Sequence, residues 1–355
     1  MTAPPQVSVV IPTHQRAASL RRVIEALGRQ DVPGGTFEVV VVCDGLKDPA
    51  LMVVEDQSLG YSLRLVEQAH QGPAAARNRG VELARGELVL FIDDDVVPAP
   101  GLIRAHMDAH GTARDRAVIG PLLPPRGHPS PWVRFEGRTL EDQYRAMEAG
   151  EWPVGPRQFY TGNASVRRRH LVEAGGFDAG FRRAEDVELA FRLRDRGVRF
   201  EFSRAAEVAH HAQRSYASWV DTGYRYGRAD VRMGRQLRRR DVIESAAREF
   251  HWRHPLTRGA VRFTLTLPPL GPLVEMLGEP VSLACCRLGA PRLADKALAA
   301  VFNIAYWRGV ADELGSGSAA LRLIELQAVP ALSAVAQAHY RQAREADTRR
   351  TEAGS

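Results

Sequence analysis

Three consecutive carboxylates, Asp93, Asp94 and Asp95, follow an apolar run at 88–92. Carboxylates this close repel one another unless a cation lies beside them, and oxygen ligands are those that Mg²⁺ and Mn²⁺ prefer. A divalent ion bound to a diphosphate would supply that cation, while a neighbouring carboxylate could accept hydrogen bonds from ribose hydroxyls. The alternative is an acidic turn that only caps the next helix. We interpret the cluster as a metal and nucleotide site.

A second pair of acids, Glu185 and Asp186, begins a segment in which Leu189 and Leu193 are four residues apart. The free N–H groups and the dipole at a helix start stabilise a carboxylate there, which keeps it ionised and fixed. These properties suit a general base that takes a proton from an attacking hydroxyl. Acids in a first helical turn are also common for stability alone, so both interpretations remain open.

Three weaker signals accompany the acids. His210 and His211 follow a short strand-like run, and a neutral imidazole can complete a metal site. The small residues at 161–165 would let the backbone approach a ligand at Gly162, although a simple turn has the same composition. Arg77 and Arg79 lie in an early turn of a predicted helix, where one of them would face a phosphate.

Alternating strand-like and helix-like patterns must position these groups. The runs at 7–11, 37–43 and 88–92 are continuously apolar, which is typical of strands buried in a parallel sheet, and 63–66 is a weaker strand. Helices are predicted at 19–27 with Ser19 as cap, at 74–85 with Gly86 as C-terminal cap, and at 185–196, before a strand at 199–202. This order predicts a doubly wound α/β sheet, in which ligands bind at the carboxyl ends of the strands.

The sequence changes character after about residue 215. We expect a catalytic domain at 1–215 with an irregular connection at 121–131, a helical extension at 216–340, and a polar, disordered tail at 341–355. Between Arg225 and Arg262 there are eleven arginines and four acids, which indicates either a solvated helix surface or contact with anionic lipid or substrate. No motif for nucleic acid accompanies these arginines.

The apolar stretch at 263–277 contains three prolines and Glu275, and it is shorter than the ~20 residues of a spanning helix. It either lies on a membrane surface or packs against the main domain. The composition, 45% hydrophobic and 25% charged over 355 residues, excludes fibrous and disordered classes. Three cysteines and an N-terminus without a signal-peptide pattern favour a cytoplasmic location, with peripheral contact at the inner face of the membrane.

The order of the motifs resembles that of the family 2 inverting glycosyltransferases of GT-A fold. The resemblance covers roughly the first 215 residues. The matching runs are Val-Val-Ile-Pro-Thr-His-Gln-Arg, Val-Val-Cys-Asp-Gly, Ala-Arg-Asn-Arg-Gly, Phe-Ile-Asp-Asp-Asp, Gly-Asn-Ala-Ser-Val, Gly-Gly-Phe-Asp and Glu-Asp-Val-Glu-Leu. Two departures, His14 in place of a common Tyr and Cys43 in place of a frequent Asp, touch the nucleotide pocket.

The resemblance implies a role for each motif. It implies a nucleotide-binding half at about 1–120 and an acceptor half at about 121–215. Asp186 would be the catalytic base, with Glu185 as the second candidate, and Asp95 and His210 would bind Mn²⁺ or Mg²⁺. Among the nucleotide contacts, Asp93 would contact the nucleoside. The full set of expected nucleotide-sugar contacts is Pro12, Thr13, Arg16, Asp44, Arg77, Asp93, Asp94, Gly162 and Asn163.

The activity implied is an inverting, metal-dependent hexosyl transfer from a nucleotide-diphosphate sugar, with UDP favoured and GDP or dTDP as alternatives. The acceptor would be a glycan, a lipid-linked molecule or a small molecule. Two other functions remain open. A nucleotide-sugar-binding protein without activity would keep only the pocket. A nucleotidyltransferase would need a glycine- and lysine-rich phosphate loop, which residues 12–16 do not form.

Overall fold

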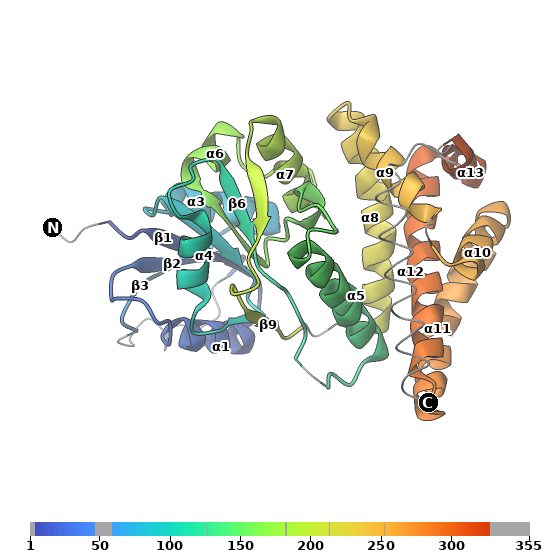
Figure 1. Ribbon diagram of the computed structural model, residues 1–355, viewed down its shortest axis with the longest axis horizontal. Helices are drawn as coiled ribbons and strands as arrows, with labels where there is room; N and C mark the ends of the chain where they lie inside the picture. Colours follow the sequence, from blue (N-terminus) through green and yellow to red (C-terminus); the bar gives the residue numbers. More distant parts are fainter. Residues whose placement is uncertain are drawn as a thin grey trace. The chain divides into compact units, whose positions relative to one another are not determined.

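The computed structural model describes residues 4–46, 59–125, 127–181, 183–212, 214–251 and 253–326 (Figure 1). The backbone divides into two compact units, Met1–Gln213 and Arg214–Ser355. The first unit is mixed α/β, and the described part of the second is helical. The expected fold class, an α/β sheet followed by a helical extension, is confirmed. The segment 341–355, for which disorder is expected, lies outside the described residues.

A mixed sheet forms the centre of the first unit, and its described strands run in the order β3-β2-β1-β4-β7-β6-β8. The strands β3, β2, β1 and β4 are parallel, while β7 is antiparallel to both β4 and β6. A separate antiparallel ribbon pairs β5 with β9. The bounds are β1 Val7–Thr13, β2 Phe37–Asp44, β3 Ser62–Gln68, β4 Leu88–Ile92, β5 Val96–Pro98, β6 Arg116–Ile119, β7 Asn163–Arg167, β8 Arg199–Phe202 and β9 Val208–His210.

Helices cover both faces of this sheet (Figure 1). Because successive side chains of a strand point to opposite faces, Val9 and Ile11 of β1 pack with α1 and α4, whereas Val10 packs with α3. Leu189 and Leu193 of α7 join the second of these two cores. The bounds are α1 Ala17–Leu27, α3 Pro73–Leu83, α4 Leu102–His110, α5 Pro131–Glu148, the 3-10 helix η2 Pro156–Gln158, α6 Arg168–Glu173 and α7 Glu185–Asp195.

Two predicted helix caps are wrong. Helix α1 begins at Ala17 after Arg16, so Ser19 lies inside the helix and does not cap it. Helix α3 ends at Leu83 with Ala84 as its C-cap, and Gly86 has another role. A Cβ atom on Gly86 would lie 2.6 Å from the backbone nitrogen of Ser8, so only glycine permits this close approach to β1. The irregular connection expected at 121–131 is followed by the long helix α5, which the sequence patterns did not indicate.

The second unit is built around α12 Pro291–Leu314, and α8, α10, α11 and α13 pack against it (Figure 1). Glycines let α8 and α12 approach closely: a Cβ atom on Gly227 would lie 2.0 Å from the carbonyl oxygen of Tyr306. Among the helices described, none combines the length and the apolar character that crossing a bilayer requires. The remaining bounds are α8 Tyr216–Gln236, α9 Arg240–Phe250, α10 Pro255–Thr266, α11 Leu270–Arg287 and α13 Gly317–Leu326.

Candidate active site

The carboxyl ends of β1, β2 and β4 meet at one edge of the sheet, because β1 lies between the other two and all three are parallel. This brings together groups that are far apart in the sequence. Thr13 ends β1, Asp44 ends β2, and Asp93, Asp94 and Asp95 follow β4 directly. The sheet topology therefore places the acidic cluster beside the end of the first strand, as ligand sites in open α/β sheets are placed.

Asp94 is held by two groups from the N-terminal segment. The hydroxyl of Thr13 donates a 2.8 Å hydrogen bond to Asp94 Oδ2. Arg16 Nη1 donates to Asp94 Oδ1 at 3.0 Å and to Asp95 Oδ2 at 2.9 Å, although the Arg16 side chain is 47% exposed. Burial raises the pKa of the Asp94 carboxyl above its ordinary value, although the hydrogen bonds from Thr13 and Arg16 lower it. Arg16 supplies positive charge to the acidic cluster from its solvent side.

Asp95 and His210 face each other across the ribbon of β5 and β9. Val96 pairs with His210 in that ribbon, and Asp95 Oδ1 lies 3.5 Å from His210 Nε2. Burial opposes ionisation of Asp95, but the hydrogen bond and charge of His210 and the charge of Arg16 outweigh it and lower the pKa of Asp95. Ligands of one divalent ion are about 2.0–2.2 Å from the metal and about 3 Å from each other. An ionised carboxylate and an imidazole at this separation fit such an ion.

Arg77 joins the two acidic motifs. Its Nη2 donates to Asp93 Oδ1 at 2.8 Å and its Nη1 donates to Glu185 Oε1 at 2.7 Å. Arg77 is buried, and although burial opposes its charge, the charges of Asp93, Glu185 and Asp186 raise its pKa above the ordinary value. The structure thus brings both predicted acidic motifs to one buried guanidinium.

Asp186 is half-buried, and one of its two carboxylate oxygens is only weakly engaged. Its Oδ1 accepts a 2.8 Å hydrogen bond from the N–H of Val187, while Oδ2 has only long contacts of 3.4 and 3.5 Å to Thr161. Burial and then the neighbouring charge of Glu185 raise the pKa of Asp186 to about 7. A carboxyl with this pKa exchanges protons near neutral pH, as a general base must.

The turn before these acids has an unusual backbone. Ala184 has φ 59° and ψ 23°, in the left-handed region that residues other than glycine rarely adopt. Such conformations cost about 1–3 kcal/mol and are kept where the surrounding structure demands them. The left-handed residue turns the chain directly into α7, so that Glu185 and Asp186 occupy its first turn.

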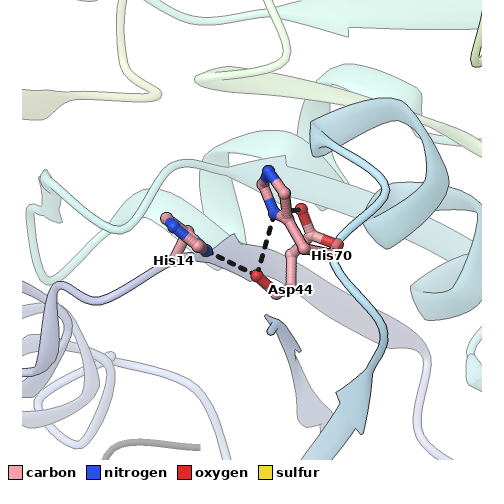
Figure 2. Close-up of side chains that lie close together, drawn as sticks. All are labelled: His14, Asp44 and His70. Atoms are coloured by element: carbon pink, nitrogen blue, oxygen red, sulfur yellow. Dashed lines mark hydrogen bonds and ion pairs between the residues drawn. The ribbon is translucent and has the colours of Figure 1, made fainter. Parts of the chain in front are cut away.

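Asp44 lies beside His14, which the sequence places at the nucleotide pocket, and beside His70, which no sequence pattern singled out (Figure 2). His14 Nδ1 is 2.5 Å from the Asp44 carbonyl oxygen, and His70 Nδ1 is 2.9 Å from Asp44 Oδ2. The two exposed imidazole rings are 4.5 Å apart. Both carboxylate oxygens of Asp44 also accept backbone hydrogen bonds, from Gln71 and Gly72. Burial alone would raise the pKa of Asp44, but these bonds and a hydrogen bond from the Gln68 amide outweigh it, so the pKa is lowered.

A signal for these histidines was present in the positions of the strands. His14 directly follows β1 and His70 comes two residues after β3, so both lie at the carboxyl edge of the sheet. The donor set of two imidazoles and one carboxylate can hold a transition-metal ion, and the rings can equally stack on or hydrogen-bond to a nucleobase. Their contact with Asp44 depends on the conformation of the short loops at 14–16 and 69–72, which no local pattern describes.

The two predicted contacts in the Thr-Gly-Asn segment differ in position. A Cβ atom on Gly162 would lie 3.3 Å from Asp93 Oδ2, so this glycine borders the acidic cluster. Asn163 is 1% exposed, and its amide donates to the carbonyl oxygens of Pro121 and Ala206 at 2.9 and 2.8 Å. The Asn163 side chain therefore joins chain segments inside the fold, and its contact with a ligand stays a prediction without support from this geometry. Pro12 lies half-buried in β1.

Comparison with known proteins places this arrangement in a family. Residues 8–184 match the model of glycosyl transferase family 2. The chain is 32% identical over 227 residues to a validoxylamine A glucosyltransferase of Streptomyces hygroscopicus subsp. jinggangensis, covering 56% of this chain and 54% of the relative. It is 29% identical over 234 residues to a pre-mycofactocin glycosyltransferase of Mycobacterium tuberculosis, covering 62% and 46%. The chain thus spans about half the length of these curated relatives.

A solved structure shows the same fold. The mannosyltransferase of Pyrobaculum calidifontis, determined with GDP-Man and Mn²⁺, matches with a TM-score of 0.58 at 22% identity. The match covers 85% of this chain and 88% of that chain. The order of the motifs, the mixed sheet and these relatives agree, and the chain belongs to glycosyl transferase family 2.

Proposed function

We propose that this protein transfers a sugar from a nucleotide-diphosphate sugar to an acceptor hydroxyl, by a single displacement that inverts the anomeric carbon. The observation that carries the proposal is the double hydrogen bond of Arg77 to Asp93 and Glu185. It links the acidic cluster after β4, where the nucleotide sugar would bind, to the start of α7, where the base would act. Because a donor site and a candidate base lie at the same buried guanidinium, the arrangement favours a transferase over a protein that only binds the nucleotide sugar.

Asp186 is the proposed base. Glu185 is engaged by the Arg77 guanidinium at 2.7 Å, whereas Asp186 Oδ2 has only contacts longer than those of an ordinary hydrogen bond. Asp186 would take the proton of the acceptor hydroxyl as its oxygen attacks the sugar from the face opposite the diphosphate. General base catalysis of this kind is worth about 10²–10⁴ in rate. Glu185 remains the second candidate.

Asp95 and His210 are the proposed ligands of a Mn²⁺ or Mg²⁺ ion. The ion would supply positive charge for the departing diphosphate. The proposal rests on the ionised state of Asp95 and the 3.5 Å separation of its Oδ1 from His210 Nε2. The similar mannosyltransferase structure contains Mn²⁺. Arg16 is half exposed and would turn from the two carboxylates toward phosphate oxygens when a nucleotide binds.

The nucleobase would lie against His14 and His70 beside Asp44, with Pro12 and Thr13 beneath it. Asp93 and Asp94 would face the nucleoside, with Gly162 leaving room for the sugar. Contact of Asn163 with the nucleotide sugar is expected only from the resemblance to the family. We favour UDP over GDP or dTDP. The two halves at about 1–120 and 121–215 would bind the nucleotide and the acceptor. The acceptor would be a glycan, a lipid-linked molecule or a small molecule, met in the cytoplasm or at the inner face of the membrane.

The test is a donor panel with matched variants. UDP-, GDP- and dTDP-sugars are incubated with the protein, Mn²⁺ or a chelator and a mixed acceptor pool, and released nucleoside diphosphate is measured. We expect release with one donor class, lost with chelator and lowered at least about 100-fold in Asp186→Asn. Asp195→Asn removes an exposed carboxylate from the same helix and should keep activity.

Two outcomes would favour the alternatives. Nucleotide binding seen as a thermal shift, without release from any donor, would support a binding protein that has no transferase activity. Release of pyrophosphate from a nucleoside triphosphate would support a nucleotidyltransferase. Retention of the anomeric configuration in the product would contradict the proposal, because a single displacement from the face opposite the diphosphate inverts that configuration.

A further inference from the structure

Exposed apolar side chains of the second unit are concentrated in one segment. Of the thirteen large apolar side chains exposed in the described part of the chain, nine lie between Leu256 and Leu293, on α10, α11, their connections and the first turn of α12. Single exposed apolar residues are normal, but a continuous cluster on adjacent elements marks an interaction surface. This segment is therefore unlike the rest of the described surface.

Helix α11 has its apolar residues on the outer face. Leu273, Met276, Leu277 and Val281 follow the spacing of one helix face and are 46%, 64%, 49% and 45% exposed. The fully buried positions of α11 are small or polar instead, and Val274 is partly buried against the core that contains α12. These buried residues are Gly271, Glu275, Gly278, Ser282 and Cys285.

Specific contacts hold the buried face of α11 against α12. The Glu275 carboxylate accepts two hydrogen bonds from Arg308 of α12, at 2.9 and 2.8 Å, so its buried charge is paired. A Cβ atom on Gly278 would lie 2.6 Å from Val301 of α12, so the glycine allows close contact between the helices. Helix α11 cannot rotate to bury its leucines without breaking these contacts. Small residues inward and large apolar residues outward are typical of helices whose outer face meets lipid.

The charges on this surface are of one sign. The exposed arginines between residues 253 and 293 are Arg253, Arg262, Arg287 and Arg292. The only two carboxylates of that range are Glu275, which is buried, and Glu279, which is half-buried. A surface of exposed leucines and arginines without exposed carboxylates is complementary to the headgroup region of an anionic bilayer. Two copies of such a surface would repel each other through their arginines.

The arginine-rich part of α8 and α9 differs from this surface. Arg225 pairs with Asp221 at 2.6 Å, and Arg228 and Arg232 pair with Glu313 at 2.8 and 3.0 Å. These arginines have partners within the second unit, so their charge is partly neutralised. The apolar and basic surface of α10 and α11 is the stronger candidate for contact with lipid.

We propose that the outer faces of α10 and α11 form a membrane-docking surface that lies in the headgroup region of a bilayer containing anionic lipid. Leu256 and Phe263 of α10, together with the four apolar residues of α11, would enter the boundary between headgroups and acyl chains. The exposed arginines would contact lipid phosphates. The inference is independent of the proposed sugar transfer, because binding to vesicles is measured without donor or acceptor.

Flotation of the full chain with lipid vesicles tests the proposal. The protein is mixed at low salt with vesicles of phosphatidylcholine alone or with about 30% phosphatidylglycerol. We expect flotation with the anionic vesicles and little with the neutral ones. The combined substitution Met276→Ser and Leu277→Ser should lower the partition coefficient at least about tenfold. Arg287→Gln with Arg292→Gln should lower it about tenfold on anionic vesicles only.

Val172→Ser is the matched control, since Val172 is 59% exposed on α6 of the first unit and its loss should change binding less than about twofold. Thermal melts check that every variant is folded. Failure of the parent protein to float with anionic vesicles at low salt would overturn the proposal. So would equal flotation of the parent and the Met276→Ser, Leu277→Ser variant. A dimer that this variant dissociates, without lipid binding, would assign the surface to self-association and also overturn the proposal.

Discussion

Replacing Asp186 by Asn should stabilise the protein in a pH-dependent way. In the folded protein the pKa of Asp186 is raised from 3.8 to about 7, first by burial and then by Glu185. Between these two values the folded carboxyl keeps a proton that the unfolded carboxyl has released. Its contribution to the free energy of unfolding therefore falls as pH rises through this window and is least favourable above pH 7. Asn carries no charge at any pH, so it removes this term.

The magnitude follows from the pKa change. One pKa unit corresponds to about 1.4 kcal/mol, so the full change is worth about 4 kcal/mol. Between pH 5.5 and 8.5 the parent protein loses only the part of this free energy that corresponds to the interval from pH 5.5 to the folded pKa of about 7. That part is about 2 kcal/mol. We expect the free energy of unfolding of Asp186→Asn, relative to the parent, to increase by that amount over this range. Changes in hydrogen bonding at Thr161 are independent of pH and cancel in the comparison.

Urea unfolding at the two pH values measures this difference, with hydrogen exchange of β4 amides as the reporter of the first unit. Asp195→Asn removes a charge from the same helix, where the side chain is 50% exposed, and should change stability by less than about 0.5 kcal/mol at both pH values. An Asp186→Asn effect that is the same at pH 5.5 and 8.5 would refute the raised pKa and, with it, the argument that Asp186 is poised as a base.

Three further outcomes are expected. The kcat/KM of the parent should rise with pH and level off above about 7, because Asp186 must lose its proton to act; a decline across this range would contradict its role. His210→Ala should weaken Mn²⁺ binding at least about tenfold by calorimetry, and unchanged affinity would remove it from the metal site. Gly227→Ala should lower the free energy of unfolding of the second unit by about 1–3 kcal/mol, because the new methyl group would meet the Tyr306 carbonyl oxygen. Gly259→Ala is the control, because its methyl group would meet nothing within 4 Å; the free energy of unfolding, measured by thermal melts for both variants, should stay equal or rise.

The sequence predicted the strands that carry the site because their patterns are local. The apolar runs in β1, β2 and β4 have no competing helical pattern, and the structure confirms all three. The polar groups that follow these strands meet because parallel neighbours share one carboxyl edge. Local patterns therefore sufficed to place Thr13 beside the acids after β4.

Contacts between distant loops could not be predicted in this way. His70 approaches Asp44 only through the path of the chain after β3, and Asn163 is buried by segments on both sides of it. The apolar stretch at 263–277 gave no indication that the large apolar residues of α11 would lie on its exposed face. That choice depends on the pairing of Glu275 with Arg308 in another helix, which is a tertiary contact.

The ribbon of β5 and β9 has a consequence for changes in chain length. His210 meets Asp95 because it is paired with Val96, and the residue after it is also histidine. Loss of one residue from the loop at 203–207 would shift β9 by one position and bring His211 opposite Val96, so an imidazole would still face Asp95. Gain of one residue would bring Ala209 there instead. The tandem histidines should make this loop tolerant of shortening by one residue and intolerant of lengthening.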